Sequence, residues 1–390
     1  MAARAAHNSL QHPSWARHTV AMTLSDHSGD APRGSVAPGF EPVREVFHDV
    51  VTRQRGTGAA VAIWHDGRWV ADLWGGWADA GRTRPWQRES IVMPYSVTKA
   101  FTAMAALVLV DRGLLDLDSA VQEHWSQLRT PATVRQLLSH QVGLVALADP
   151  APPELLLDWD GLCSRLAGQE PLWTSGTAIG ESALFYGHLV GELVRRVDGR
   201  PFGTFLRDEV CGPAALDFHI GLDDQAQARA VDLTEVDSLV AGLGGDDRPA
   251  LLRQALLNPP GALDQDTVNS SAFRRAEVPA VNGHGTARAV AGLYAALLAG
   301  RVISPSLRDE AASAQAHGID RVMGGPERAW GLGFGVDDEG FGMGGIGGSA
   351  GWASTRDEYA FAFVTGTMGD HDRSDAVETA FRDVLGLPPL

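Results

Sequence analysis

Strand-like patterns lie near the two ends of this chain, and helical patterns dominate the long stretch between them. Close to the N-terminus, residues 59–79 predict two strands joined at Asp66-Gly67, a dipeptide suited to a tight hairpin turn. Further strands are predicted after Trp330, at residues 331–336, 340–345, 347–355 and 358–368. The simplest arrangement is one sheet built from both ends of the chain, with a mostly helical insertion over it.

This pattern predicts an α/β (α+β) fold in which an antiparallel sheet is flanked by helices. Residues 1–40 are polar and are expected to form a flexible N-terminal arm. Residues 41–110 and 285–390 are expected to form the α/β domain, which begins with a helix after Pro42 and ends with one at 373–386. Residues 111–284 are expected to form the helical domain, and the cleft between the two is the natural place for a site.

The charge of the chain favours a small-molecule partner. The 390 residues carry a formal net charge of −16 and a pI of about 5.2, which opposes nonspecific binding to nucleic acid or to an anionic membrane. The longest apolar run, at 103–110, is too short to span a bilayer, and the N-terminus has no apolar segment typical of a signal peptide. We therefore expect a cytoplasmic protein with no nucleic-acid or membrane partner.

One serine and one lysine stand three positions apart at the start of a long apolar run. Lys99 is the single lysine among 32 basic residues, and Ser96 precedes it by one helical turn. Arginine stays protonated in essentially any protein site, whereas a buried lysine amine can lose its proton and then accept one from a hydroxyl. The pair Ser96–Lys99 therefore predicts a serine nucleophile with a lysine base, and an exposed lysine beside a helix-capping serine is the less favoured alternative.

Other chemical signals in the sequence are weaker. Residues 347–351, GGSAG, fit the G-x-S-x-G nucleophile elbow, but that motif needs a helix after the serine and Ser349 is followed by a strand pattern. His140 and His284 are expected to have buried hydrogen-bonding roles. The two cysteines are too few for a disulfide framework, and no cluster of ligand residues points to a metal or to another cofactor.

The sequence also resembles the serine β-lactamase-like proteins, of the class C β-lactamase, DD-peptidase and family VIII carboxylesterase type. The likeness covers roughly residues 40 to 385 and includes, in the same order as in that family, VADLWGGWAD, Ser96-x-x-Lys99, GLLDLDSAV, VRQLLSHQVGL, GELVRRVDGRPFG, EVPAVNGHGTARAVAGLYAAL and GFGMGGIGGSAGWAS. It implies a β-lactamase/transpeptidase-like fold and acylation of Ser96. It also implies that the backbone N–H groups of Ser96 and Ile346 hold the oxyanion, with Gly345 beside the substrate.

Two family elements are altered in this chain. The family places a tyrosine that assists proton transfer five residues after the glycine of a W-x-P-G stretch, and the same count in WTSGTAIGES leads to Glu181. Either Glu181 acts there as a general base, or Tyr186 takes the role or contacts the substrate, although packing is favoured for Tyr186. The third family element begins with a cation, and here Met343 stands in its place, so substrates with a carboxylate are disfavoured.

These features together predict an acyl-transfer enzyme for a small ester or amide, with carboxylesterase first. The alternative is an acyltransferase or transamidase of secondary metabolism that passes the acyl group to an amine or alcohol. A family member that binds ligands without turnover is the third hypothesis, because two of the family elements are altered.

Overall fold

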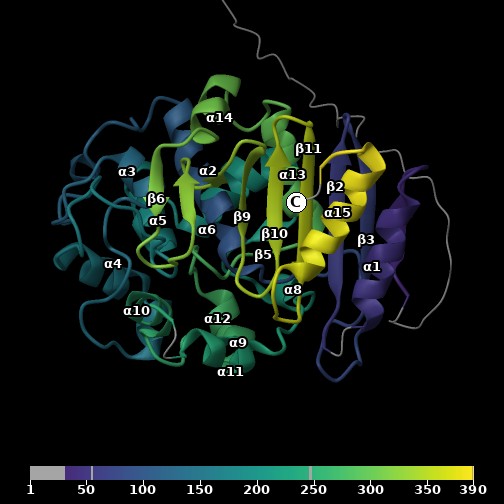
Figure 1. The fold of residues 1–390 in the computed structure, drawn as a ribbon. Helices are drawn as coiled ribbons and strands as arrows, with labels where there is room; N and C mark the ends of the chain where they lie inside the picture. Colours follow the sequence, from purple (N-terminus) through teal and green to yellow (C-terminus); the bar gives the residue numbers. More distant parts are fainter. Residues whose placement is uncertain (1–30, 54–55, 246–247, 389) are drawn as a thin grey trace, which may run out of the picture.

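The computed structural model describes residues 31–53, 56–245, 248–388 and 390. Its main feature is an antiparallel sheet of nine strands in the order β1-β3-β2-β11-β10-β9-β8-β7-β6 (Figure 1). The strands of this sheet are β1 Arg33–Val36, β2 Ala59–His65, β3 Arg68–Gly75, β6 Ala316–Ile319, β7 Glu327–Trp330, β8 Gly335–Val336, β9 Gly340–Gly344, β10 Ala350–Ser354 and β11 Tyr359–Thr365. A separate pair joins β4 Phe218–His219 to β5 His284–Gly285.

The two ends of the chain meet in the middle of the sheet, as the sequence predicted. β2 pairs with β11 over its whole length, with Ala59 opposite Thr365 and His65 opposite Tyr359. The hairpin between β2 and β3 turns at Asp66 and Gly67, whose φ angles of 48° and 75° fit the left-handed turn expected for this dipeptide. The predicted fold class is therefore confirmed.

Helices cover both faces of the sheet and fill the region beside it. They are α1 Glu41–Arg53, α2 Thr98–Asp111, α3 Val134–Leu138, α4 Trp159–Gly168, α5 Tyr186–Asp198, α6 Phe202–Leu206, α7 Gly212–Ala214, α8 Asp224–Gln227, α9 Val236–Leu243, α10 Ala250–Leu257, α11 Gln265–Asn269, α12 Ser271–Arg275, α13 Ala287–Leu298, α14 Pro305–Ala311 and α15 Asp372–Leu385. The terminal helices α1 and α15 pack together and lie in front of the sheet in Figure 1, while α13 crosses behind β2, β10 and β11.

Alternation along the central strands explains the two cores. On β11, Phe361 and Phe363 point toward α1 and α15, while Ala360 and Ala362 belong to the larger core on the face of α13. Small residues on that second face let α13 approach the sheet closely, and large ones fill the space under α1 and α15. The strands thus carry apolar residues on both faces, as expected for a sheet covered on both sides.

The structure differs from the sequence predictions at two places. Residues 33–36, which fall in the predicted N-terminal arm, form the edge strand β1 against β3, and residues 1–30 lie outside the described residues. The predicted strand at 331–336 is only β8 at its end, because Gly333 has a φ of 91° and turns the chain between β7 and β8. The predicted domain boundaries at 110/111 and 284/285 stay a prediction.

Candidate active site

Ser96 lies on a strained turn at the start of a buried helix. The 3₁₀ turn η2 (Tyr95–Val97) runs directly into α2, and Tyr95 has a φ of 47°, a value that non-glycine residues seldom adopt. The first twelve residues of α2 are all buried, as the apolar pattern predicted. Surrounding packing therefore holds the serine in one place, and such strain is common at functional sites.

The side chain of Lys99 reaches the hydroxyl of Ser96. The Lys99 Nζ atom lies 2.7 Å from Ser96 Oγ, and the lysine side chain has no exposed surface. Its other neighbours are the carbonyl oxygen of Ala280 at 3.2 Å and the carboxylate of Glu181 at 3.1 Å. Burial lowers the pKa of Lys99 below its ordinary value, and the Glu181 carboxylate opposes that shift only in part. A buried amine in this position can take the proton of the serine hydroxyl.

Glu181 completes a cluster of three polar side chains. It belongs to the segment between α4 and α5, and its Oε1 atom lies 3.4 Å from Ser96 Oγ as well as 3.1 Å from Lys99 Nζ. Only about 8% of its side chain is exposed, so Glu181 is not a solvated loop carboxylate. The count along WTSGTAIGES thus led to a residue that does lie beside the serine. We call Ser96, Lys99 and Glu181 the Ser96 cluster.

The end of β9 lies close to the backbone before Ser96. β9 packs against η2, and a Cβ atom at Gly345 would collide with the carbonyl oxygen of Pro94, so only glycine allows this approach. The next residue, Ile346, is part of a tight turn that is closed by a 2.7 Å hydrogen bond from Gly345 N to Ser349 O. Among the described backbone hydrogen bonds outside the helices and strands, none uses the Ile346 or the Ser96 amide.

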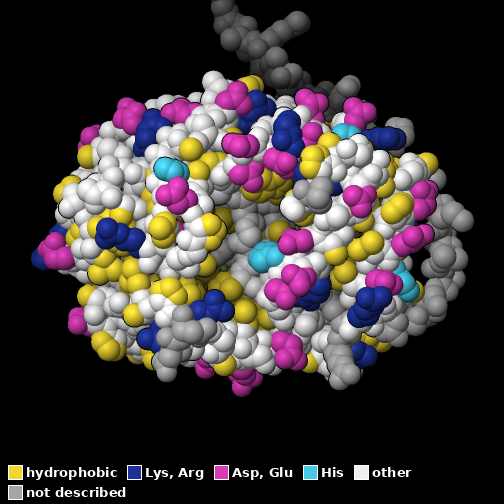
Figure 2. Space-filling model, in the orientation of Figure 1, with side chains coloured by type: hydrophobic (Ala, Val, Ile, Leu, Met, Phe, Trp, Pro, Cys, Tyr) yellow, Lys and Arg dark blue, Asp and Glu magenta, His cyan; other side chains and the backbone are white. Residues whose placement is uncertain are grey.

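The residue in the position of the family's cation is buried and apolar. Met343 is 6% exposed and belongs to the larger core. The imidazole of His371 lies beside the following residue, Gly344: a Cβ atom built on Gly344 would stand 3.3 Å from Cε1 of His371. Figure 2 shows that the molecular surface is hollowed over β9, with hydrophobic and acidic side chains around the rim.

Tyr186 has the environment of a packing residue. It is 1% exposed, its hydroxyl donates to the carbonyl oxygen of Leu138 at 3.2 Å, and its ring lies 4.6 Å from that of His140. Among the contacts that the structure describes, none joins it to Ser96 or Lys99. The rival nucleophile Ser349 is also buried; its Oγ accepts the N–H of Thr365, and the strand β10 follows it where the elbow motif requires a helix.

Two groups near the site carried no signal in the sequence. The Ala280 carbonyl, which contacts Lys99, is a backbone group, and any residue type would supply it. The Asp320 carboxylate accepts a hydrogen bond from the Glu181 amide at 2.9 Å, but its surroundings in the sequence, GIDRVMGG, match no motif. Both groups are recognised only from their tertiary contacts, which require a three-dimensional structure.

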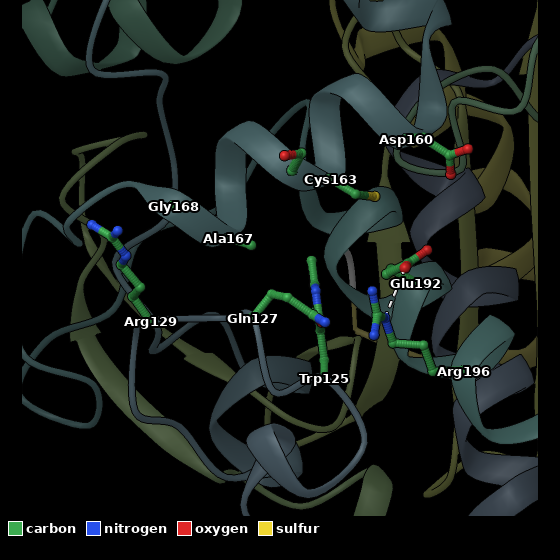
Figure 3. A pocket seen from close by; sticks show the side chains of 10 residues that line it. Trp125, Gln127, Arg129, Asp160, Cys163, Ala167, Gly168, Glu192 and Arg196 are labelled. Atoms are coloured by element: carbon green, nitrogen blue, oxygen red, sulfur yellow. Dashed lines mark hydrogen bonds and ion pairs between the residues drawn. The ribbon is translucent and has the colours of Figure 1, made fainter.

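A separate cavity lies between α4, α5 and the loop at 125–129 (Figure 3). It has a volume of about 440 Å³ and contains no member of the Ser96 cluster. Its buried carboxylate, Glu192, is already paired with Arg196 at 2.8 Å, so its charges largely satisfy one another.

The described residues show neither a disulfide nor a metal-binding cluster nor a membrane-spanning helix. Cys163 and Cys211 are both free and buried. In the described ranges, no group of three or more His, Cys, Asp or Glu side chains is placed to hold a metal ion. No helix in these ranges is long and apolar enough to cross a membrane.

Comparison with known proteins agrees with this geometry. The Beta-lactamase family model matches residues 43–384. The esterase/beta-lactamase LipL of Mycobacterium tuberculosis (strain ATCC 25618 / H37Rv) is 31% identical over 380 residues, which cover 87% of this chain and 85% of LipL. A family VIII carboxylesterase has a similar structure, with 32% identity, a TM-score of 0.82, and coverage of 90% of this chain and 99% of the other.

A penicillin-binding protein homolog from Caulobacter crescentus is similar to the same degree. It has 33% identity and a TM-score of 0.81, again with coverage of 90% of this chain and 99% of the other. The family model matches most of this chain, and each similarity also covers most of the relative's own length. The chain therefore belongs to the beta-lactamase family and is a serine hydrolase of the β-lactamase fold.

Proposed function

We propose that this protein hydrolyses a small ester or amide through an acyl-enzyme on Ser96. The observation that carries the proposal is the distance of 2.7 Å between Lys99 Nζ and Ser96 Oγ inside a buried site. At that distance an unprotonated amine accepts the hydroxyl proton as the oxygen attacks. The likeness to a family VIII carboxylesterase and to LipL supports an ester as the first substrate class.

In the acylation step, the Ser96 oxygen forms a bond to the acyl carbon while its proton passes to Lys99. The negative charge that develops on the acyl oxygen is held by the amide groups of Ser96 and Ile346. The tetrahedral intermediate then collapses, and the bond to the alcohol or amine leaving group breaks. The proton on Lys99 passes to that leaving group, either directly or through Glu181, so the site returns to its first protonation state.

In the second step, water attacks the acyl-enzyme and Glu181 accepts the water proton. The Glu181 carboxylate is well suited to this because it lies 3.4 Å from Ser96 Oγ, the oxygen that carries the acyl group. An ionised carboxylate can accept a proton from water. The proton then returns to Ser96 as the acid leaves. Glu181 thereby performs the work for which the family uses a tyrosine.

The substrate proposed here carries no carboxylate beside the acyl group. Met343 offers no positive charge at the strand end, and Glu181 adds a negative charge to the site. Both features disfavour anionic substrates by electrostatic repulsion and desolvation. Esters and amides that are neutral near the acyl carbon fit this site better.

The proposal is tested with p-nitrophenyl acetate and butyrate. Ser96→Ala is expected to lose at least about 10⁴-fold in kcat/KM, because the nucleophile is gone. Mass spectrometry of protein quenched during turnover is expected to find the acyl group on the peptide that contains Ser96, and the Ser349→Ala variant is expected to keep that adduct. Turnover that survives in Ser96→Ala, or an adduct on Ser349, would overturn the proposal.

The same assay distinguishes the final acceptor. Added primary amines or alcohols compete with water for the acyl-enzyme, and the product is identified by chromatography. Amide or new ester in excess of free acid would replace hydrolysis by the predicted alternative, acyl transfer. Ligand binding in the absence of any Ser96-dependent burst would instead favour the non-catalytic hypothesis.

A further inference from the structure

Three consecutive backbone N–H groups around Glu181 are held by only two other residues. Gly180 N donates to the carbonyl oxygen of His140 at 3.0 Å, and Ser182 N donates to Nδ1 of the same residue at 3.3 Å. Between them, Glu181 N donates to Oδ2 of Asp320 at 2.9 Å. This segment is neither helix nor strand, so these bonds take the place of a regular hydrogen-bond ladder.

The Asp320 carboxylate is itself rigidly held. It has no exposed surface, and its second oxygen, Oδ1, accepts the N–H groups of Val322 and Met323, each at 2.9 Å. Oδ2 also accepts the indole N–H of Trp330 at 3.3 Å. A buried carboxylate with four donors has little freedom to move, so it fixes the amide of Glu181 to the turn after β6.

His140 is fixed in a comparable way. Its φ of 59° lies in the left-handed region, and its ring packs against Tyr186 at 4.6 Å and Trp330 at 4.3 Å. Burial lowers the pKa of its imidazole to about 3, so the ring is neutral near pH 7. Because Nδ1 accepts the Ser182 N–H, the proton is on Nε2, which has no hydrogen-bond partner among the described residues. The ring is therefore held by packing and by its one contact to the Glu181 segment.

We propose that His140 and Asp320 are positioning residues that hold the backbone of Glu181 where its carboxylate reaches both Ser96 and Lys99. A glutamate on an irregular segment has several rotatable bonds, and a displacement of about 1 Å can cost about 100-fold in rate. The two residues act only through Glu181. The inference therefore rests on the proposed role of Glu181 in proton transfer.

A double-mutant cycle tests this dependence. Asp320→Asn keeps the size of the side chain but places an NH₂ group against one pair of donors. The Asn oxygen is expected to stay with the two 2.9 Å partners in the turn, Val322 and Met323, so that the Glu181 amide loses its acceptor. We expect kcat for p-nitrophenyl butyrate to fall about 10- to 100-fold with KM within about threefold.

The decisive measurement is the same substitution in a Glu181→Gln background. If Asp320 acts only through Glu181, Asp320→Asn lowers kcat there by less than about threefold, because coupled residues are not additive. An equal fold loss in both backgrounds would show a general structural role and overturn the proposal. All rates are divided by the burst amplitude, so that unfolded protein does not count as lost activity.

Two further variants keep the test decisive. His140→Asn retains the backbone acceptor for Gly180 and tolerates the left-handed φ, but it removes the imidazole, with both its Nδ1 contact and its packing on Tyr186 and Trp330. It is expected to show a smaller loss of kcat than Asp320→Asn, again confined to the Glu181 background. It carries the test if Asp320→Asn does not fold. Asp337→Asn is the matched control, since this carboxylate also accepts two backbone N–H groups, at 2.8 and 3.0 Å, in another turn. We expect its kcat to stay within about twofold.

The controls also separate this inference from the proposed function. Unchanged kcat in Glu181→Gln would remove the role of Glu181 and with it the positioning role of both residues, while the acyl-enzyme on Ser96 would stand. Activity that survives in Ser96→Ala would instead overturn the proposed function itself.

Discussion

Two polar clusters lie on opposite sides of the central sheet. Each combines a cation, a hydroxyl and a carboxylate, but we assign them different roles. The Ser96 cluster combines a hydroxyl, a lysine and a carboxylate within 3.4 Å. The second, which we call the α15 cluster, consists of Glu339, Tyr359, Glu378 and Arg382. There the Arg382 guanidinium donates to Glu339 at 2.7 Å and to Tyr359 at 3.0 Å, and Tyr359 donates to Glu378 at 2.6 Å.

The difference between the clusters lies in their cation. Arg382 keeps its proton in any accessible pH range, so it cannot act as a base and only holds the helix to the sheet. Lys99 can release its proton because burial lowers its pKa, and Ser96 next to it is slightly open to solvent, at 6% exposed. Among the 32 basic residues of the chain, the single lysine therefore lies in the cluster for which we propose proton transfer.

The largest expected effect is on activity and comes from replacing the lysine of the Ser96 cluster by an arginine. Lys99→Arg keeps the positive charge but removes the base, and we expect kcat/KM for p-nitrophenyl butyrate to fall by at least about 10³-fold. Circular dichroism and the melting temperature show whether the fold is retained. A variant that folds and keeps more than a tenth of the activity would mean that the two clusters do not differ in the way described.

The next largest effect is on stability and falls on the α15 cluster. Arg382→Met leaves Tyr359 without its buried cationic partner and Glu339 with Arg356 alone, and we expect a loss of about 2–3 kcal/mol in the free energy of unfolding. The activity per folded molecule is expected to stay within about threefold, since the cluster lies across the sheet from Ser96. Urea unfolding and active-site titration measure the two quantities separately, and a selective loss of activity would contradict the comparison.

A smaller effect follows from pH. Burial raises the pKa of Glu378 to about 7, whereas in the unfolded chain the group titrates near 4.5. Between these values only the folded protein keeps the proton, so stability is lost as the pH rises through about 7. We expect a decrease of about 1–3 kcal/mol between pH 5 and pH 8 in urea unfolding. Glu378→Gln should remove that part of the decrease, and an unchanged slope in this variant would exclude Glu378 as its source.

The smallest effect is expected at Tyr186. Tyr186→Phe removes one buried hydrogen bond, to the Leu138 carbonyl, and should cost about 1 kcal/mol of stability with activity within about threefold. If activity instead falls about 100-fold with an unchanged melting temperature, Tyr186 and not Glu181 would be the group that moves the proton.

Periodicity and turn chemistry were enough to predict most of the architecture. The Asp66-Gly67 hairpin and the buried helix after Ser96 follow from local residue preferences, which the structure confirms. The edge strand β1 was missed because its sequence, RGSV, is short and gains its stability from pairing with β3. Local pattern carries little information about such edge strands.

For the site, spacing along the chain predicted side chains but not their supports. Ser96 and Lys99 are one helical turn apart, so their proximity could be derived from the sequence. The position of Glu181 required the family's spacing, and its contact with Ser96 depends on tertiary packing. Asp320 could not be predicted, because it meets Glu181 only through the fold and its local sequence resembles an ordinary turn.

The pairing of β2 with β11 has a consequence for how this enzyme comes into being. During synthesis Ser96 and Lys99 leave the ribosome early, but the turn at 345–349 and the strand β11, which completes the middle of the sheet, emerge only late in the chain. A nascent chain therefore exposes the edge of β2 until late, and it stays inactive for that time. Because this pairing joins distant parts of the chain, we expect the sheet to form more slowly than α5 and α13. We also expect chaperones to bind the exposed edge of β2.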